Sequence, residues 1–124
     1  MARILVVDDD PTFRMLVQEW LQEEGYSVQT ASGVEEALVL YRSDPFDLVI
    51  TDMVMPIRGG VSFIMDIRRD YPRARILAMS GGDYVEPEDY LRLAQSLGAV
   101  RVLTKPFEAK DFLKAVREAI ASAD

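Results

Sequence analysis

Four aspartates in this sequence follow or end short apolar segments. Asp8, Asp9 and Asp10 follow the segment ILVV, and Asp52 ends the segment LVITD. Carboxylates that stand so close repel one another, and burial in a medium of low dielectric constant strengthens the repulsion. A chain that ends buried segments on such acids is therefore expected to place a cation beside them.

The composition restricts which metal ion could be that cation. The sequence contains neither cysteine nor histidine, so thiolate and imidazole ligands are excluded. A metal site would have oxygen ligands alone, which hard cations such as Mg²⁺ or Mn²⁺ prefer. Mg²⁺ is commonly bound by one or two carboxylates together with water and phosphate oxygens. The acids therefore predict a magnesium site that a phosphoryl group would complete.

A hydroxyl and an ammonium group stand at the ends of two further apolar segments. Ser80 ends the segment ILAMS, and Thr104 and Lys105 end the segment RVLTK. A carboxylate can act as the nucleophile toward phosphorus and form an acyl phosphate. Phosphoryl transfer otherwise needs mainly positioning and charge stabilisation. Asp52, Ser80 and Lys105 are therefore candidates to surround one phosphoryl group.

The elements that must position these residues alternate along the chain. Apolar, β-rich segments predict strands over residues 3–8, 26–31, 47–52, 75–80 and 100–104. Helical patterns predict helices over residues 10–25, 32–42, 59–71, 86–98 and 108–124. Strands that alternate with helices favour βαβ units and a parallel sheet.

Capping residues indicate where two of the helices begin. Asp10 and Pro11 fit the N-cap and the first position of the first helix, and Gly25 fits its end. Ser32, followed three residues later by Glu35, predicts a capping box at the start of the second helix.

The continuously apolar runs ILVV and LVI are typical of strands covered by helices on both faces. We therefore predict a doubly wound α/β fold, the flavodoxin-like (βα)5 arrangement, with a parallel five-stranded sheet of order 2-1-3-4-5 and helices on both faces. In such sheets ligands bind beyond the carboxyl ends of the strands, at the switch point between strands 1 and 3. Asp8, Asp9 and Asp52 stand at that point.

Length and charge set the class of protein. The 124 residues predict one domain over residues 1–124, with no output domain. The net charge of −7 argues against a nucleic-acid-binding surface. The absence of cysteine suits a reducing cytoplasm, and no apolar segment is long enough for a signal peptide or a membrane span. A cytoplasmic protein without membrane contact is expected.

The segments that carry these residues resemble those of the receiver domains of two-component response regulators, in the stand-alone form of chemotaxis regulators. The resemblance covers residues 3–121. VVDDD resembles the acidic pair of the family, DLVITDMVMP the phosphoacceptor segment, LAMSGG the strand-4 segment and LTKPF the strand-5 signature. Each motif alone is weak, but four in the expected order, each at the end of the expected strand, are specific.

This resemblance implies how the residues act. It implies Asp52 as the phosphoacceptor, Ser80 as the conformational hydroxyl and Lys105 as the lysine that acts with them. It also implies a cis peptide bond between Lys105 and Pro106.

The resemblance also implies a metal site. Mg²⁺ (or Mn²⁺) would be held by Asp9, Asp52 and the backbone carbonyl of Val54, and Asp8 would act through a metal-bound water.

The implied function is a phosphorylatable signalling switch of a phosphorelay. The switch would receive a phosphoryl group on Asp52 from the phosphohistidine of a histidine kinase in a Mg²⁺-dependent reaction. It would hydrolyse the aspartyl phosphate slowly and would not be a multiple-turnover enzyme. Its expected partners are a histidine kinase or a histidine phosphotransfer protein and a downstream protein. A monomer is expected, or a weak dimer through the face formed by helix 4, strand 5 and helix 5.

Two features depart from the family pattern. The aromatic switch residue of the family stands three positions before the lysine, where this sequence has Val102, so an aromatic rotation is impossible there. The loop after Ser80 is also longer than is usual in the family. From these two features the signal is expected to pass through the segment 81–86 and the fourth helix.

Two other classes of protein remain as alternatives. Asp8, Asp10 and Thr12 match the DxDxT pattern of haloacid-dehalogenase-like phosphatases, in which Asp8 would be the nucleophile. A flavodoxin-like cofactor binder ranks last, because three aspartates in the first loop would repel a phosphate.

Overall fold

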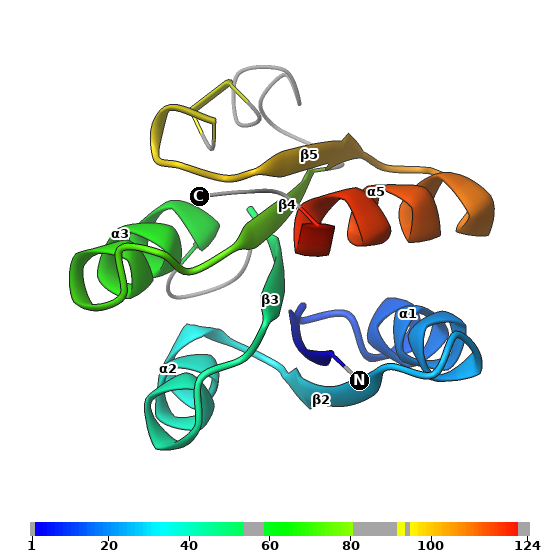
Figure 1. The fold of residues 1–124 in the computed structure, drawn as a ribbon, viewed down its shortest axis with the longest axis horizontal. Coiled ribbons are helices and arrows are strands. Elements are labelled where there is room, and N and C mark those ends of the chain that lie inside the picture. Colours follow the sequence, from blue (N-terminus) through cyan, green and yellow to red (C-terminus); the bar gives the residue numbers. More distant parts are fainter. Residues whose placement is uncertain (1, 54–58, 81–91, 94, 122–124) are drawn as a thin grey trace.

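The computed structural model describes residues 2–53, 59–80, 92–93 and 95–121 (Figure 1). The strands and helices of this part of the chain are β1 (Arg3–Val7), α1 (Pro11–Glu23), β2 (Ser27–Ala31), α2 (Val34–Ser43), β3 (Leu48–Asp52), α3 (Gly60–Asp70), β4 (Ile76–Ser80), β5 (Arg101–Thr104) and α5 (Ala109–Ala121). Of the helix predicted over 86–98, the described residues 92–93 and 95–96 are helical, and Gly98 follows them with a φ of 105°. The predicted start of this helix lies outside the described residues.

The sheet has the predicted order, β2-β1-β3-β4-β5 (Figure 1). Every neighbouring pair is parallel. The register pairs Val7 of β1 with Thr51 of β3, and Ser80 of β4 with Thr104 of β5. The carboxyl ends of all these strands therefore meet at one edge of the sheet.

Two layers of helices bury the two faces of the sheet. In Figure 1, α2 and α3 lie on one side of the strands, and α1 and α5 lie on the other. The side chains of β1 alternate between these layers: Leu5 and Val7 belong to the core under α2 and α3, whereas Ile4 and Val6 belong to the core under α1 and α5. This alternation confirms the prediction of a sheet covered on both faces. Among the described helices, none combines the length and apolar character that crossing a membrane requires.

The first helix begins and ends as its capping residues predict. The Asp10 carboxylate accepts hydrogen bonds from the backbone N–H groups of Thr12 (3.0 Å) and Phe13 (3.3 Å), and Pro11 is the first helical residue. Gly25, just beyond the helix, has a φ of 91°, a conformation that glycine adopts without strain.

The predicted capping box of the second helix is wrong by one residue. The N-cap is Gly33, and the amide and hydroxyl of Ser32 both donate to Oε1 of Glu36, at 2.8 and 3.1 Å, in place of Glu35. The helix begins later because Val34 at its first position is buried in the core. With Gly33 as the N-cap, the third helical residue, whose side chain folds back over the first turn, is Glu36.

The first turn of α3 lies directly against the end of β3. The Gly60 N–H donates to the Met53 carbonyl at 3.1 Å. A Cβ atom on Gly60 would lie 2.6 Å from the Asp52 carbonyl oxygen and 2.8 Å from the Met53 Cα. Only glycine therefore allows this contact between the two backbones.

We predict that Gly60→Ser destabilises the fold and that Gly33→Ser does not. Gly60→Ser should lower the free energy of unfolding by about 2 kcal/mol, because its Cβ would overlap backbone atoms. Gly33 has an extended backbone and open space around it, and serine is a good N-cap, so the change there should stay within about 0.5 kcal/mol. Urea unfolding of both variants measures the difference, and equal stability would contradict the close approach.

Candidate functional site

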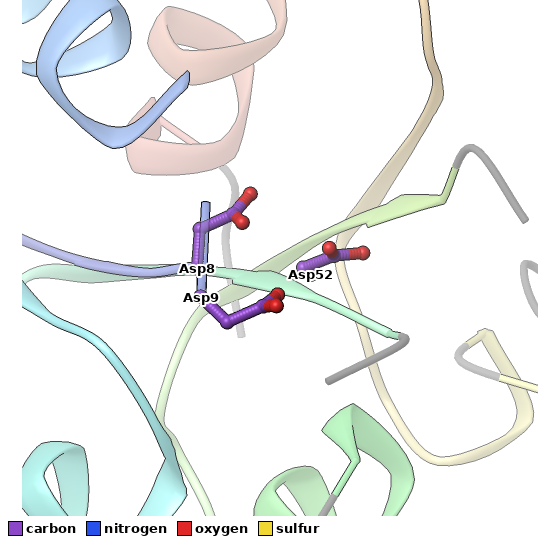
Figure 2. A group of neighbouring side chains, drawn as sticks. All are labelled: Asp8, Asp9 and Asp52. Atoms are coloured by element: carbon purple, nitrogen blue, oxygen red, sulfur yellow. The ribbon is translucent and has the colours of Figure 1, made fainter. Parts of the chain in front are cut away.

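Three aspartates come together at the carboxyl edge of the sheet. Asp8 directly follows β1, Asp9 is the next residue, and Asp52 ends β3. One carboxylate oxygen from each lies within 4.8 Å of the other two, and Figure 2 shows the three side chains gathered around the ends of these strands. Asp8 is fully buried and Asp52 is 8% exposed, whereas Asp9 is exposed. The cluster that the sequence predicts is therefore present, with one member open to solvent.

Lys105 supplies part of the expected positive charge. It follows β5, and its backbone N–H donates to the Ser80 carbonyl at 2.8 Å. Its Nζ lies 3.1 Å from Oδ2 of Asp8 and 3.4 Å from Oδ2 of Asp52. Among the described residues, three carboxylates and the one ammonium of Lys105 leave a net negative charge in the cluster. The site can therefore accept a further cation, and its ligands would be oxygen atoms.

Backbone contacts fix the position of Asp8. Its Oδ1 accepts a hydrogen bond from the Asp10 N–H at 2.9 Å, and its own N–H donates to the Ala31 carbonyl at 3.2 Å. The Arg14 guanidinium donates to the Asp8 carbonyl at 2.7 Å. Arg14 is a residue that the sequence did not single out, because its spacing of four residues relates it to Asp10 on the helix and not to Asp8.

Ser80 lies at the end of β4 with its hydroxyl buried. The residue is fully buried, and its Oγ has no hydrogen-bond partner among the described residues. A buried hydroxyl without a partner costs free energy, so such groups are rare and call for an explanation. An acceptor that enters the site would relieve this cost. Thr104, its partner in the register of β5, is exposed.

The structure describes some of the other predicted features and not others. The peptide bond between Lys105 and Pro106 is cis. Val102 is half-buried and packs against the core under α2 and α3. Val54, a predicted metal ligand through its carbonyl, lies outside the described residues, as does the segment 81–86.

The DxDxT pattern has a structural explanation. Asp10 is exposed and its carboxylate caps α1, where it accepts from the N–H of Thr12 and Phe13. Its carboxylate is thus used at the helix N-terminus. The pattern results from the start of a helix that follows directly after the acidic pair.

We predict that Lys105→Met weakens the fold in the absence of divalent cations. The free energy of unfolding at neutral pH should fall by about 1–3 kcal/mol, because Asp8 and Asp52 would lose a shared counter-ion while they stay buried.

Lys110→Met is the matched control, since Lys110 is exposed and lies 3.8 Å from an equally exposed Glu108. It should change stability by less than about 0.5 kcal/mol. Urea unfolding without divalent cations compares the two variants, and an unaltered Lys105→Met protein would refute the role of the ion pair.

Comparison with known proteins identifies the family. The family model of the response regulator receiver domain matches residues 4–117. Among curated relatives, a response regulator receiver protein of Anaeromyxobacter sp. is 36% identical over 86% of this chain, and the protein CcdB of Bacillus subtilis is 34% identical over 94%. The match covers 43% of the Anaeromyxobacter protein and 95% of CcdB. The chain spans about half the length of several other curated relatives, 48% of a Klebsiella pneumoniae CpxR protein for example.

Solved structures agree with this match. The chemotaxis protein CheY4 of Vibrio cholerae is 33% identical with a TM-score of 0.86, covering 96% of this chain and 98% of that one. A receiver domain protein from Clostridium thermocellum is also 33% identical, with a TM-score of 0.89 over 97% of this chain and 94% of its own. These matches give no support to the phosphatase alternative. With its predicted sheet order and acidic cluster in place, the chain belongs to the receiver domains of two-component response regulators, a family of signalling switches.

Proposed function

We propose that the chain is a phosphorylatable switch in which Asp52 accepts a phosphoryl group from the phosphohistidine of a histidine kinase or of a histidine phosphotransfer protein. The observation that carries this proposal is the Lys105 ammonium, which lies between the carboxylates of Asp8 and Asp52. An ammonium at that position can stabilise negative charge that a phosphoryl group brings to Asp52.

The surroundings of the three acids favour Asp52 as the acceptor. Asp8 is fully buried, and both of its carboxylate oxygens accept hydrogen bonds, one from the Asp10 N–H and one from Lys105. Asp9 is exposed and lies outside the contacts of Lys105 that the structure shows. Asp52 retains some exposure and also contacts the ammonium. It therefore combines access for a donor with charge stabilisation.

The transfer step exchanges one bond to phosphorus for another. A carboxylate oxygen of Asp52 forms a bond to phosphorus while the bond between phosphorus and the imidazole nitrogen breaks. The electron pair of the broken bond stays on that nitrogen, and the product is an acyl phosphate. Lys105 would donate to one phosphoryl oxygen, and the Ser80 hydroxyl, which is buried without a partner among the described residues, would donate to another.

The acidic cluster fits a divalent hard cation. Its ligand atoms are carboxylate oxygens, and its charge exceeds what Lys105 compensates. Asp9 and Asp52 would hold Mg²⁺ (or Mn²⁺) directly and Asp8 would act through a water. The backbone carbonyl of Val54, which the family resemblance implies as a ligand, would be a further ligand of the ion. When bound, the ion neutralises charge on the phosphoryl oxygens.

We infer a cytoplasmic phosphoacceptor that hydrolyses its own acyl phosphate slowly and does not turn over a substrate repeatedly. Its net charge of −7 favours protein partners over nucleic acid as contacts of this domain. A downstream protein would recognise the phosphorylated state. The domain would be a monomer, or a weak dimer that forms through the face that includes β5 and α5.

We predict that acetyl phosphate with Mg²⁺ adds one phosphoryl group to the wild-type protein and none to Asp52→Asn. Intact-mass spectrometry measures the adduct directly. Asp10→Asn is the matched control, because asparagine also caps helices and Asp10 caps α1; it should still be phosphorylated. An Asp52→Asn protein that carries the adduct, or a wild-type protein that never does, would rule out the assignment.

We also predict that Mg²⁺ stabilises the fold through the acidic cluster. A ligand that binds only the folded state at about one hundred times its Kd adds about 2.7 kcal/mol. Thermal unfolding in MgCl₂, compared with NaCl of equal ionic strength, should show a rise in Tm for the wild type. Asp9→Asn should lose most of this rise, while Asp111→Asn, an exposed aspartate on α5, should keep it. Equal responses of the wild type and Asp9→Asn would argue against Asp9 as a ligand.

A further inference from the structure

Lys105 contacts an aromatic ring in addition to the charged groups of the site. Its Nζ lies 4.1 Å from the centroid of the Phe13 ring, over the face of that ring. The face of an aromatic ring carries partial negative charge and attracts an ammonium at this distance. Lys105 is therefore held from several sides, by the carboxylates of Asp8 and Asp52 and by the ring of Phe13.

The Phe13 ring is itself fixed by aromatic packing. Phe107 meets it edge-on, with centroids 5.8 Å apart and planes at 73°. Phe107 in turn stacks on Phe112, at 5.5 Å and 10°, and Phe112 is fully buried. Because Phe107 comes two residues after Lys105, the segment that carries the ammonium also orients the ring below it. The contact is thus part of the packed layer between α1 and α5.

A lysine side chain needs such a constraint because its four-carbon stem has many rotamers. The Lys105 side chain is 22% exposed, so part of it is in contact with solvent. Charge alone fixes the ammonium only loosely, because a Coulomb attraction depends on distance and hardly on direction, and a phosphoryl group on Asp52 would add negative charge there. The Phe13 ring provides an attraction that does not depend on that charge.

We propose that Phe13 is a positioning residue that keeps the Lys105 ammonium beside Asp52, ready to contact the incoming phosphoryl group. The proposal rests on the proposed function, because it assumes that Asp52 is the acceptor. The competing explanation is that Phe13 only fills space between α1 and Phe107. Leucine distinguishes the two, since it is apolar and can be buried but has no aromatic face.

The test compares Phe13→Leu and Phe13→Tyr with Trp20→Leu. Trp20 is the matched control: it lies on α1, is half-buried, and packs against Phe112 at 5.8 Å, at the far end of the same aromatic row. With acetyl phosphate and saturating Mg²⁺, Phe13→Leu should be phosphorylated about three- to tenfold more slowly than the wild type, given the usual strength of a cation–π contact. Phe13→Tyr should stay within about twofold because it restores the ring, and Trp20→Leu should match the wild type.

A spectroscopic readout checks the contact without any phosphorylation. Protons above an aromatic face resonate upfield, so the ε-methylene protons of Lys105 should be shifted in the NMR spectrum of the wild type and of Phe13→Tyr. In Phe13→Leu the shift should be lost. A Phe13→Leu protein with wild-type rate or an unchanged Lys105 shift would overturn the proposal, as would equal slowing by Trp20→Leu. If the wild type takes up no phosphoryl group, the proposed function fails, and the NMR comparison still decides whether Phe13 holds Lys105.

Discussion

The Lys105 ammonium between two buried carboxylates is the interaction that the rest of this structure must accommodate. Asp8, Asp52 and Lys105 stand at the ends of β1, β3 and β5, so they can meet only if these strands are parallel and share one edge. The order β2-β1-β3-β4-β5 leaves a single strand, β4, between the second acid and the lysine, a gap that a four-carbon stem can cross. Helices cover both faces, so the charged groups are confined to the carboxyl edge of the sheet, where Asp9 is exposed and Asp52 keeps a small exposure.

Much of this architecture could be predicted from the sequence because its signals are local. Apolar runs mark the strands, Asp10 and Pro11 mark the start of α1, and a general rule for doubly wound sheets supplies the strand order. The start of α2 shows where local signals stop. The spacing of Ser32 and Glu35 predicts one partner for the Ser32 amide, but the burial of Val34 in the core starts the helix one residue later and makes Glu36 the partner.

The contacts around Lys105 could not be predicted, because they depend on how distant elements pack. No spacing rule relates Phe13 or Arg14 on α1 to residues at the ends of the strands, and their side chains reach the site only through the rotamers that packing selects. The same limit applies to Ser80: its residue type suggested a hydroxyl near the site, but a hydroxyl without a partner among the described residues is a property of the folded interior. Sequence therefore indicates which groups reach the edge, and packing determines what each of them touches.

The approach of α3 to β3 gives the site a mechanical connection. At Gly60 two backbones are in contact, with no side chain between them whose rotamers could absorb a displacement. A shift of the Asp52 backbone must therefore either strain the first turn of α3 or move the helix as a rigid body. The helix has 11 residues, which corresponds to a length of about 16 Å. A small tilt at Gly60 would thus become a larger displacement at Asp70, at the other end of the helix.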